Sequence, residues 1–200
     1  KIIARNLDII YLDTGATYRV ATFVALQKET DDAKEIIEFI EKNPISFMNG
    51  QKGQEVLMGS ENVTEVIRTN EVTNTVSKIS AMTEIREFMV AEQQRIAKNG
   101  GIIMDGRDIG TVVLPKADLK IFLVASVDER AERRYKENLS KGIPTDLERL
   151  KIEISERDRK DSTRAISPLK QAEDAILLDS TGKTINEIVQ FIEDKAKELM

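Results

Sequence analysis

Four short apolar runs, separated by sequence with helical periodicity, constrain most strongly what this chain can fold into. The runs lie at residues 9–12, 102–104, 119–125 and 175–179. Apolar runs of this length are typical of buried strands, and helices between consecutive strands favour parallel pairing. The sequence therefore predicts an α/β fold, with a parallel sheet flanked by helices.

Charged residues follow one of these runs directly. The run at 102–104 continues into Asp105, Gly106, Arg107 and Asp108, in the sequence IIMDGRDIGTVVLP. Ligands of open α/β sheets bind beyond the carboxyl ends of the strands, so this position favours a functional site over the same charges on a helix face. The alternative for DGRD alone is a polar turn with one ion pair.

A second strand end carries polar residues of a different kind. Asp13 and Thr14 follow the run at 9–12, and either can cap a helix that holds Tyr18 and Arg19 in its first turns. This arrangement brings a hydroxyl, a phenol and a guanidinium close to one strand end. A helix cap with a surface arginine is the structural alternative.

The sequence between these two strand ends predicts helices and a small β insert. Helical patterns cover residues 31–41, the region that begins at Arg68, and residues 84–98. Short alternating runs separated by Gly and Asn predict an antiparallel insert from 45 to 63. Ser77 lies off the apolar face of its helix, and the helix at 84–98 carries Arg86.

Two highly charged helices follow the run at 119–125. Residues 126–129 and 145–148 fit capping boxes that would open them, and a third box at 184–187 would open the last helix. Few apolar residues lie between 149 and 164, so we expect an arginine-rich hairpin with little buried surface. Such a hairpin suits a mobile lid over polyphosphate, and a solvated charged face is the alternative.

Composition limits the chemistry. The chain has 200 residues, no Cys and no His, and a net charge of −5. One domain fits this length, and thiol chemistry, Ser-His catalysis and histidine-bound zinc are excluded. A negative chain is a poor general nucleic-acid binder. No apolar run approaches the length of a membrane helix, and we expect a cytoplasmic globular protein whose site uses carboxylates, Lys, Arg, hydroxyls or Mg²⁺.

A phosphate-binding loop of the form GxxxxGK[ST] does not occur in these 200 residues. Gly182-Lys183-Thr184 resembles its end, but Leu177 stands where the first glycine is required. Residues 1–7 read as the tail of a helix that such a loop would open. We therefore expect a strand and a glycine-rich loop immediately upstream of Lys1.

Five motifs, in order along the chain, resemble those of bacterial cytidylate kinases. They are YLDTGATYR at 11–19, IRTNEV at 67–72, MDGRDIGTVVLP at 104–115, ASVDERAERRYKE at 125–137 and ERDRKDSTRAISPL at 156–169. The resemblance runs from Lys1 to the last helix. It implies a P-loop kinase-type sheet and transfer of the γ-phosphoryl group of ATP to CMP or dCMP, with Mg²⁺.

The resemblance also implies a division of the chain. A single nucleoside monophosphate kinase domain would have its core at 1–43, 68–134 and 165–200. The monophosphate-binding insert would span about 44–67, and the lid about 135–164. The small-molecule partners would be CMP, dCMP and ATP, and we expect a monomer without nucleic-acid or membrane partners.

Roles for single residues follow from the same resemblance. The residues expected to hold CMP are Thr14, Tyr18, Arg19, Ser77, Arg86, Arg107, Asp108, Arg157, Asp161 and Arg164. Within this set, three would clamp the CMP phosphate, namely Arg19, Arg107 and Arg164. Three would read the cytosine, namely Ser77, Arg86 and Asp108. Two would meet the ribose, namely Arg157 and Asp161, and two would line the acceptor pocket, namely Thr14 and Tyr18.

The remaining roles concern catalysis and ATP. The arginines expected to act in catalysis are Arg107, Arg157 and Arg164. Those expected in or beside the lid, near the ATP phosphates, are Arg130, Arg133 and Arg134. No residue is assigned to a metal, and the role of Asp105 stays open between a structural one and one near the metal.

Elementary chemistry agrees with these roles. Phosphoryl transfer needs positioning and charge neutralisation more than acid–base groups, which an arginine-rich site without histidine can supply. The Asp108 carboxylate would accept from the cytosine amine, whereas a uracil carbonyl would leave it unpaired. The alternatives are a CMP-binding module with impaired catalysis, should the chain begin at Lys1, and a related kinase for UMP or AMP.

Overall fold

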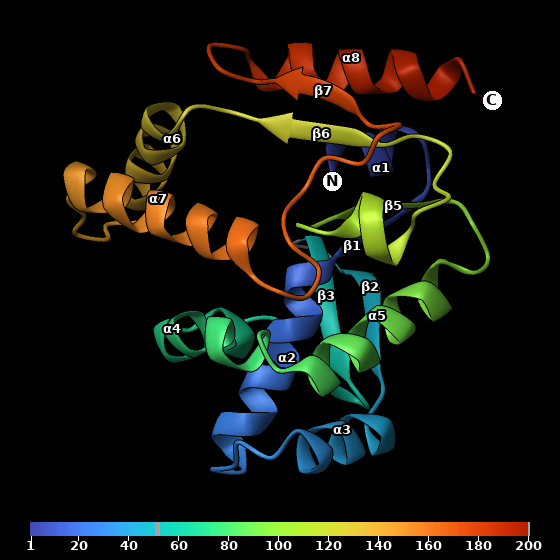
Figure 1. The fold of residues 1–200 in the computed structure, drawn as a ribbon, viewed down its shortest axis with the longest axis vertical. Coiled ribbons are helices and arrows are strands. Elements are labelled where there is room, and N and C mark those ends of the chain that lie inside the picture. Colours follow the sequence, from blue (N-terminus) through green and yellow to red (C-terminus); the bar gives the residue numbers. More distant parts are fainter. Residues whose placement is uncertain (51–52, 200) are drawn as a thin grey trace. The chain divides into compact units, whose positions relative to one another are not determined.

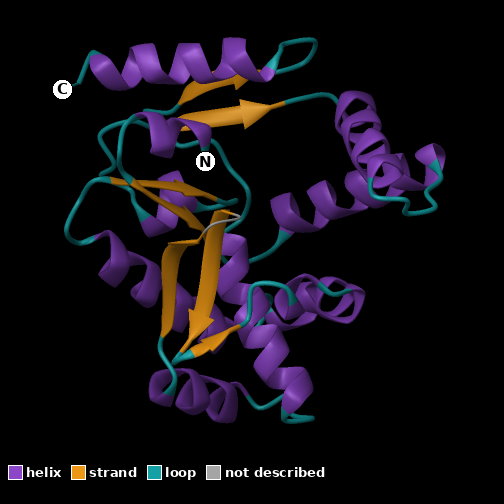
Figure 2. Cartoon of the chain, turned by 180° about the vertical axis from the view of Figure 1, so that it is seen from behind, coloured by secondary structure: helices purple, strands orange, loops and turns teal. Residues whose placement is uncertain are grey.

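The computed structural model describes residues 1–50 and 53–199, so residues 51–52 of the predicted insert lie outside the described part. Residues 3–109 and residues 110–200 form two compact units, which we describe separately. Figures 1 and 2 show the elements of both units from opposite sides.

The first unit contains a two-stranded parallel sheet. Strand β1 (Ile10–Asp13) pairs with β5 (Ile102–Asp105), and Asp13 lies opposite Asp105 in the register. A short helix, α1 (Ile2–Asn6), precedes β1. The parallel pairing confirms the prediction for these two apolar runs, and it brings both polar strand ends to the same edge.

Helix α2 (Thr14–Gln27) is the centre of the first unit's core. Its small and β-branched residues Val20, Ala21 and Val24 have no exposed surface. Three helices pack against it or its neighbours, namely α3 (Ala33–Lys42), α4 (Asn70–Ile79) and α5 (Thr83–Ala97). The side chains that meet there are mostly aliphatic, with aromatic residues packed among them, so the core is stabilised by apolar burial.

The β insert is confirmed as antiparallel. Its strands β2 (Ile45–Gly50), β3 (Gly53–Met58) and β4 (Glu61–Asn62) are ordered β2-β3-β4 (Figure 2). Val56 and Met58 of β3 are buried in the core of the unit. The prediction for the helix that follows is wrong by two residues. Arg68 ends a 3₁₀ turn at Val66–Arg68, and α4 begins only at Asn70.

The second unit contains another two-stranded parallel sheet, in which β6 (Ile121–Val124) pairs with β7 (Ile176–Asp179). The four described parallel strands thus pair two by two. The expectation that residues 119–125 form a fully buried strand is wrong. Lys120 lies outside β6 and bonds Asp174, and Leu123 is 54% exposed.

Helices α6 (Val127–Ser140), α7 (Leu147–Thr163) and α8 (Ile185–Lys197) complete the second unit. The box at 184–187 is confirmed in full, and Ser126 caps α6 by accepting from the Glu129 backbone N–H. The box at 145–148 is wrong, because the Asp146 carboxylate caps α7 instead. A π-helical turn at Ile109–Val113 was not predicted. None of the helices in the described ranges is both long and apolar enough to cross a membrane.

Candidate functional site

A buried ion pair lies just beyond the carboxyl end of β5. Arg86 Nη2 donates to Asp108 Oδ2 at 2.5 Å, and the two side chains are only 3% and 6% exposed. Removing either partner would leave a buried charge uncompensated, so the pair fixes the geometry of both groups. Of the two DGRD carboxylates, the structure buries Asp108 and leaves the residue Asp105 exposed.

Arg86 joins three segments of the first unit. Besides its bond to Asp108, its Nη1 donates to the backbone carbonyl of Ser80 at 3.1 Å, directly after α4. Its guanidinium carbon lies 5.2 Å from the centroid of the Tyr18 ring, within the range of a cation–π contact. Tyr18 and Asp108, which belong to two of the five motifs, and Arg86, which lies on the predicted helix at 84–98, therefore form one buried cluster.

Arg19 is held on the neighbouring face of α2. Its Nη1 donates to the Thr73 hydroxyl at 2.8 Å and to the Ile67 carbonyl at 3.2 Å. Ser77 lies one helical turn beyond Thr73 on α4, and both residues are exposed. The structure thus brings Arg19 to the helix that carries Ser77, while the residue Arg107 is exposed after β5.

The paired ends of β1 and β5 form a polar junction. The Thr14 hydroxyl donates to the Asp105 carbonyl at 2.7 Å, and the Tyr11 hydroxyl donates to Asp105 Oδ1 at 2.6 Å. Although the residue Asp105 is exposed, crowding of its carboxyl by protein atoms raises its pKa, and the nearby Asp13 adds to this rise against the opposing bond from Tyr11. Burial and the bond to Asp105 likewise raise the pKa of Tyr11.

The second unit holds a cluster at the end of α7. Asp161 lies between two arginines, 3.9 Å from Arg157 Nε and 3.7 Å from Arg164 Nη1. Arg164 Nε also donates to the carbonyl of Ser167, at 2.5 Å. The three residues assigned by resemblance to the ribose and the CMP phosphate are therefore neighbours within this unit.

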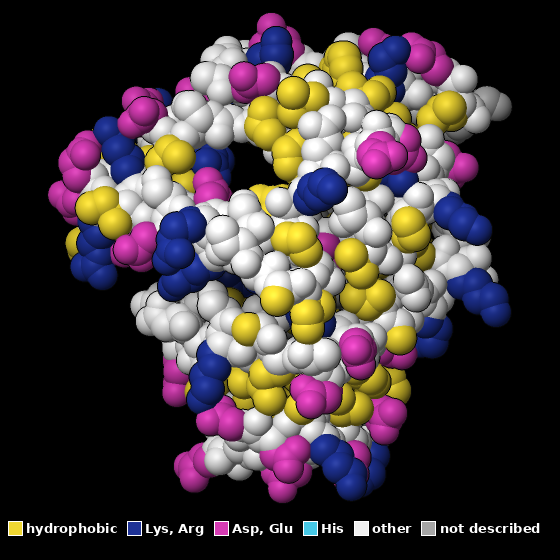
Figure 3. All heavy atoms as spheres, viewed as in Figure 1, with side chains coloured by type: hydrophobic (Ala, Val, Ile, Leu, Met, Phe, Trp, Pro, Cys, Tyr) yellow, Lys and Arg dark blue, Asp and Glu magenta, His cyan; other side chains and the backbone are white. Residues whose placement is uncertain are grey.

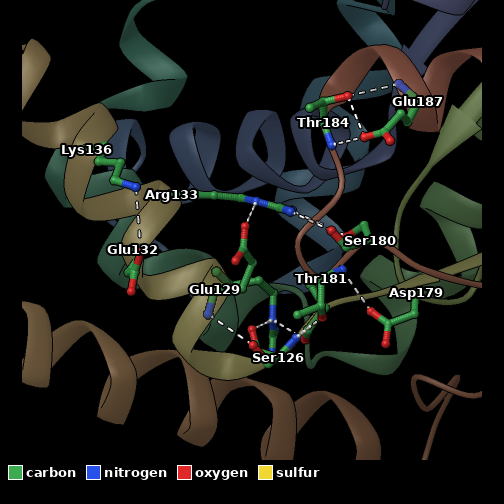
Figure 4. Close-up of polar contacts among 12 residues, drawn as sticks. Ser126, Glu129, Glu132, Arg133, Lys136, Asp179, Ser180, Thr181, Thr184 and Glu187 are labelled. Carbon is green, nitrogen blue, oxygen red and sulfur yellow. Dashed lines mark hydrogen bonds and ion pairs between the residues drawn. The ribbon is translucent and has the colours of Figure 1, made fainter.

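The three arginines predicted for ATP occupy different environments. Arg130 makes a bidentate pair with Asp158 of α7, at 2.9 and 2.6 Å. Arg133 reaches Glu129 and the carbonyl of Ser180, as Figure 4 shows. The Arg134 side chain is 56% exposed and lies 3.5 Å from Glu137. Arg130 and Arg133 thus tie elements of the second unit together.

Charges of both signs cover the α6–α7 hairpin. Figure 3 shows Lys and Arg side chains next to Asp and Glu side chains along it. Of α7, only Leu150 is buried. This agrees with the predicted hairpin of low buried surface, while the pairing of Arg130 with Asp158 adds an inter-helix contact that sequence reasoning missed.

Sequence reasoning also missed Tyr11, Thr73 and Gln93. Tyr11 was read as a strand residue, and its bond to Asp105 depends on the register of β1 and β5. Gln93 Nε2 donates to the Thr17 hydroxyl at 2.9 Å in the core. Its position seven residues after Arg86, on the same helical face, is the pattern that could have indicated it.

The donor set of the first unit fits a cation carried by phosphate. No group of three or more His, Cys, Asp or Glu residues suited to a metal occurs in the described part of the chain. Asp13 and Asp105, however, are register partners at one strand edge, and Mg²⁺ in phosphoryl-transfer sites takes one or two carboxylates plus phosphate oxygens. The arrangement as a whole offers guanidinium groups for phosphates and a buried carboxylate for a base amine.

Comparisons with known proteins give the family. The family model described as cytidylate kinase matches residues 1–198. A protein named cytidylate kinase from Lactococcus lactis subsp. lactis (strain IL1403) is 99% identical over 200 residues, which cover all of this chain and 91% of that protein. A second, from Lactococcus lactis subsp. cremoris (strain MG1363), is 84% identical with the same coverage. A third, from Streptococcus pyogenes serotype M6, is 61% identical over 203 residues, covering all of this chain and 90% of that protein. The chain belongs to the cytidylate kinase family.

Proposed function

We propose that this chain transfers the γ-phosphoryl group of ATP to CMP or dCMP, giving CDP or dCDP, in pyrimidine nucleotide metabolism. Membership of the cytidylate kinase family supports the reaction class. The observation that carries the choice of base is the buried pair of Arg86 and Asp108 beside Tyr18.

In this proposal Asp108 reads the base. Its carboxylate accepts a hydrogen bond from the exocyclic amine of cytosine. Arg86 and the Ser77 hydroxyl donate hydrogen bonds to the acceptor atoms of the cytosine ring. The bond from Arg86 holds the carboxylate in one orientation before the base arrives. Because Asp108 is only 5% exposed, the base reaches it after neighbouring side chains shift, and in this dry environment an unmatched uracil carbonyl is costly.

Arginines position and neutralise the acceptor phosphate. By the resemblance to the family, Arg19, Arg107 and Arg164 would bind the CMP phosphate, with Arg157 and Asp161 at the ribose. A nucleoside monophosphate is largely ionised at neutral pH, since its second pKa is about 6. Its oxygen therefore attacks the γ-phosphorus of ATP without a general base, and arginines stabilise the charge on the transferring group.

ATP and Mg²⁺ are the co-substrate and metal that we propose. Mg²⁺ supplies charge neutralisation and orientation of the β- and γ-phosphates when bound. Asp13 and Asp105 are the carboxylates that would face it. Of the three arginines predicted for ATP, Arg134 has the side chain with the largest exposed fraction. It is the one that we assign most directly to the ATP phosphates.

The remaining features of the proposal concern the setting of the reaction. We propose a monomer in the cytoplasm that has nucleotides as its partners and no nucleic acid or membrane. The absence of cysteine and the net charge of −5 support this setting. The single-domain organisation, with a β insert and an α6–α7 lid, stays part of the proposal.

A coupled ADP-release assay tests the function. Mg·ATP is supplied with CMP, dCMP, UMP or AMP, and turnover is expected with CMP and dCMP far above UMP and AMP. Chelation of Mg²⁺ is expected to stop turnover while leaving calorimetric binding of CMP. Equal use of all four monophosphates would overturn the proposal.

A further inference from the structure

Gln93 is an amide without exposed surface in the core of the first unit. It lies on the face of α5 that also holds Arg86 and Met89, both buried. Nothing in the proposed reaction uses it. An apolar side chain of similar volume would avoid the cost of burying an amide, so the contacts of Gln93 need an explanation.

The amide bonds α2 in one defined way. Its Nε2 donates to the Thr17 hydroxyl at 2.9 Å, and that hydroxyl donates its own proton to the Thr14 carbonyl at 2.8 Å. The single hydroxyl hydrogen of Thr17 is already donated to Thr14, so the Thr17 hydroxyl can only accept from Gln93. Gln93 Oε1 has no hydrogen-bond partner among the described residues, which leaves the bond to Thr17 as the amide's one polar anchor.

The contact continues from α2 to the end of β5. Thr14, which accepts from Thr17 through its carbonyl, uses its hydroxyl to bond the Asp105 carbonyl at 2.7 Å. Asp105 opens the DGRD turn that ends at Asp108. Two threonines therefore link Gln93 on α5 to the backbone that carries the base-reading carboxylate.

A second contact joins the same two helices. Tyr18 follows Thr17 on α2, and its ring lies beneath Arg86, two turns before Gln93 on α5. Arg86 can contact this ring and Asp108 at the same time only if α5 lies at one position along the axis of α2. Apolar contacts between helices tolerate small slides and rotations, whereas a buried hydrogen bond selects one register.

We infer that Gln93 is a positioning residue for base recognition. Its bond to Thr17 holds α5 against α2 so that Arg86 is aligned with Asp108. This alignment in turn maintains the discrimination of cytosine from uracil. Gln93 does not touch the nucleotide. The inference rests on the proposed function, because it concerns the base that this site reads.

The test compares Gln93→Met with Gln94→Met. Methionine preserves volume and loses the amide at the buried position, while Gln94 is exposed on the same helix. The measured quantity is the ratio of kcat/KM for CMP to that for UMP, supported by calorimetric affinities for both, since a ratio does not depend on the folded fraction. Small misplacements of binding groups carry large kinetic costs, so Gln93→Met is expected to lower the ratio about tenfold. The KM for CMP should rise more than kcat falls, and Gln94→Met should keep the ratio.

Variants of Thr17 provide the second arm. Thr17→Val removes the acceptor and is expected to lower the ratio as Gln93→Met does, while Thr17→Ser keeps the hydroxyl and should keep the ratio. The double variant Thr17→Val with Gln93→Met should fall no further than either single change, since both remove one interaction.

The role of Gln93 and the proposed function fail on different results. A CMP preference that survives both Gln93→Met and Thr17→Val, or effects of the two that simply add, would overturn the role of Gln93 alone. A wild-type chain that does not prefer CMP to UMP would overturn the proposed function itself.

Discussion

Burial determines what each charged residue can do. Asp108 and Arg86 are almost fully enclosed, whereas Arg107, one residue earlier, is exposed. An enclosed carboxylate discriminates strongly between a donor and an acceptor placed against it, because water cannot substitute for the missing partner. The pair is therefore suited to selecting a base, and the exposed arginine to meeting a phosphate.

Replacement of Asp108 by Asn tests the selection of the base. The substituted amide would present donors to the uracil carbonyl and lose acceptor capacity for cytosine. We expect kcat/KM for CMP to fall about 100-fold and that for UMP to change far less, since a base contact contributes roughly 1–3 kcal/mol. Steady-state kinetics with both nucleotides measure this, and Asp118→Asn, at an exposed residue, is the control.

The same substitution has a cost in stability. It leaves the Arg86 guanidinium buried without its counter-charge, which lowers the free energy of unfolding by about 3 kcal/mol. An unchanged ratio of CMP to UMP use would contradict the role of Asp108, whatever happens to the stability.

Gly106 has a steric role in the DGRD turn. A Cβ at this position would lie 2.3 Å from Thr14 Oγ1 and 2.7 Å from Ile109 Cδ1. We expect Gly106→Ala to displace Thr14 from the Asp105 carbonyl and to lower the free energy of unfolding by about 1–3 kcal/mol. Urea denaturation measures the change.

The control for this prediction is Gly110→Ala. There the nearest atom is Cδ of the long Lys120 side chain, at 3.3 Å, so the neighbour yields more easily. Equal losses of stability for the two substitutions would show that the tight approach at Gly106 is not responsible.

At the scale of the elements, the α6–α7 hairpin buries few side chains. Leu150 is the one buried residue of α7. We therefore expect the bidentate ion pair of Arg130 with Asp158 to contribute to the stability of the contact between the two helices. Sequence reasoning gave Arg130 to the ATP phosphates. In the structure its guanidinium bonds Asp158 and the carbonyl of Ala125, and the assignment to ATP stays a prediction.

Substitution of Asp158 by Asn tests this inter-helix contact. Loss of the charge weakens a half-exposed pair, for which about 1 kcal/mol is a reasonable upper value. Amides of α7 are then expected to exchange with deuterium up to about fivefold faster. Glu153→Gln, which removes the partner of Arg149 within α7, should leave the contact between the helices unaffected. Equal exchange rates in the wild type and Asp158→Asn would contradict the structural role of the pair.

At the scale of the whole molecule, nucleotide binding should appear as stability. CMP that binds only the folded chain raises the free energy of unfolding by about 2.7 kcal/mol at one hundred times its dissociation constant. For a chain of this size that corresponds to a rise of about 5–10 °C in the thermal midpoint. UMP at the same concentration should give a much smaller rise. Equal shifts with CMP and UMP would indicate that the folded chain does not select the base.

Much of the architecture follows from sequence pattern alone. The apolar runs, the spacing of helical residues and the Gly- and Asn-separated insert predicted parallel strands, helices and an antiparallel hairpin, all of which the structure contains. These features depend on local periodicity, which neighbouring residues determine. The order of five motifs also gave the family, which the comparisons confirm.

Only the tertiary structure decided which polar groups meet. Three contacts could not be predicted from the spacing of residues along the chain. They are the capping of α7 by Asp146 and not Thr145, the ion pair of Arg130 with Asp158, and the hydrogen bond of Gln93 to Thr17. The sequence placed charges after β5 but could not tell that Asp108 would be buried against Arg86 and Asp105 left exposed. Burial and pairing depend on how distant segments pack, so the sequence alone indicated the class of chemistry, and packing decided which polar residues are buried and which are paired.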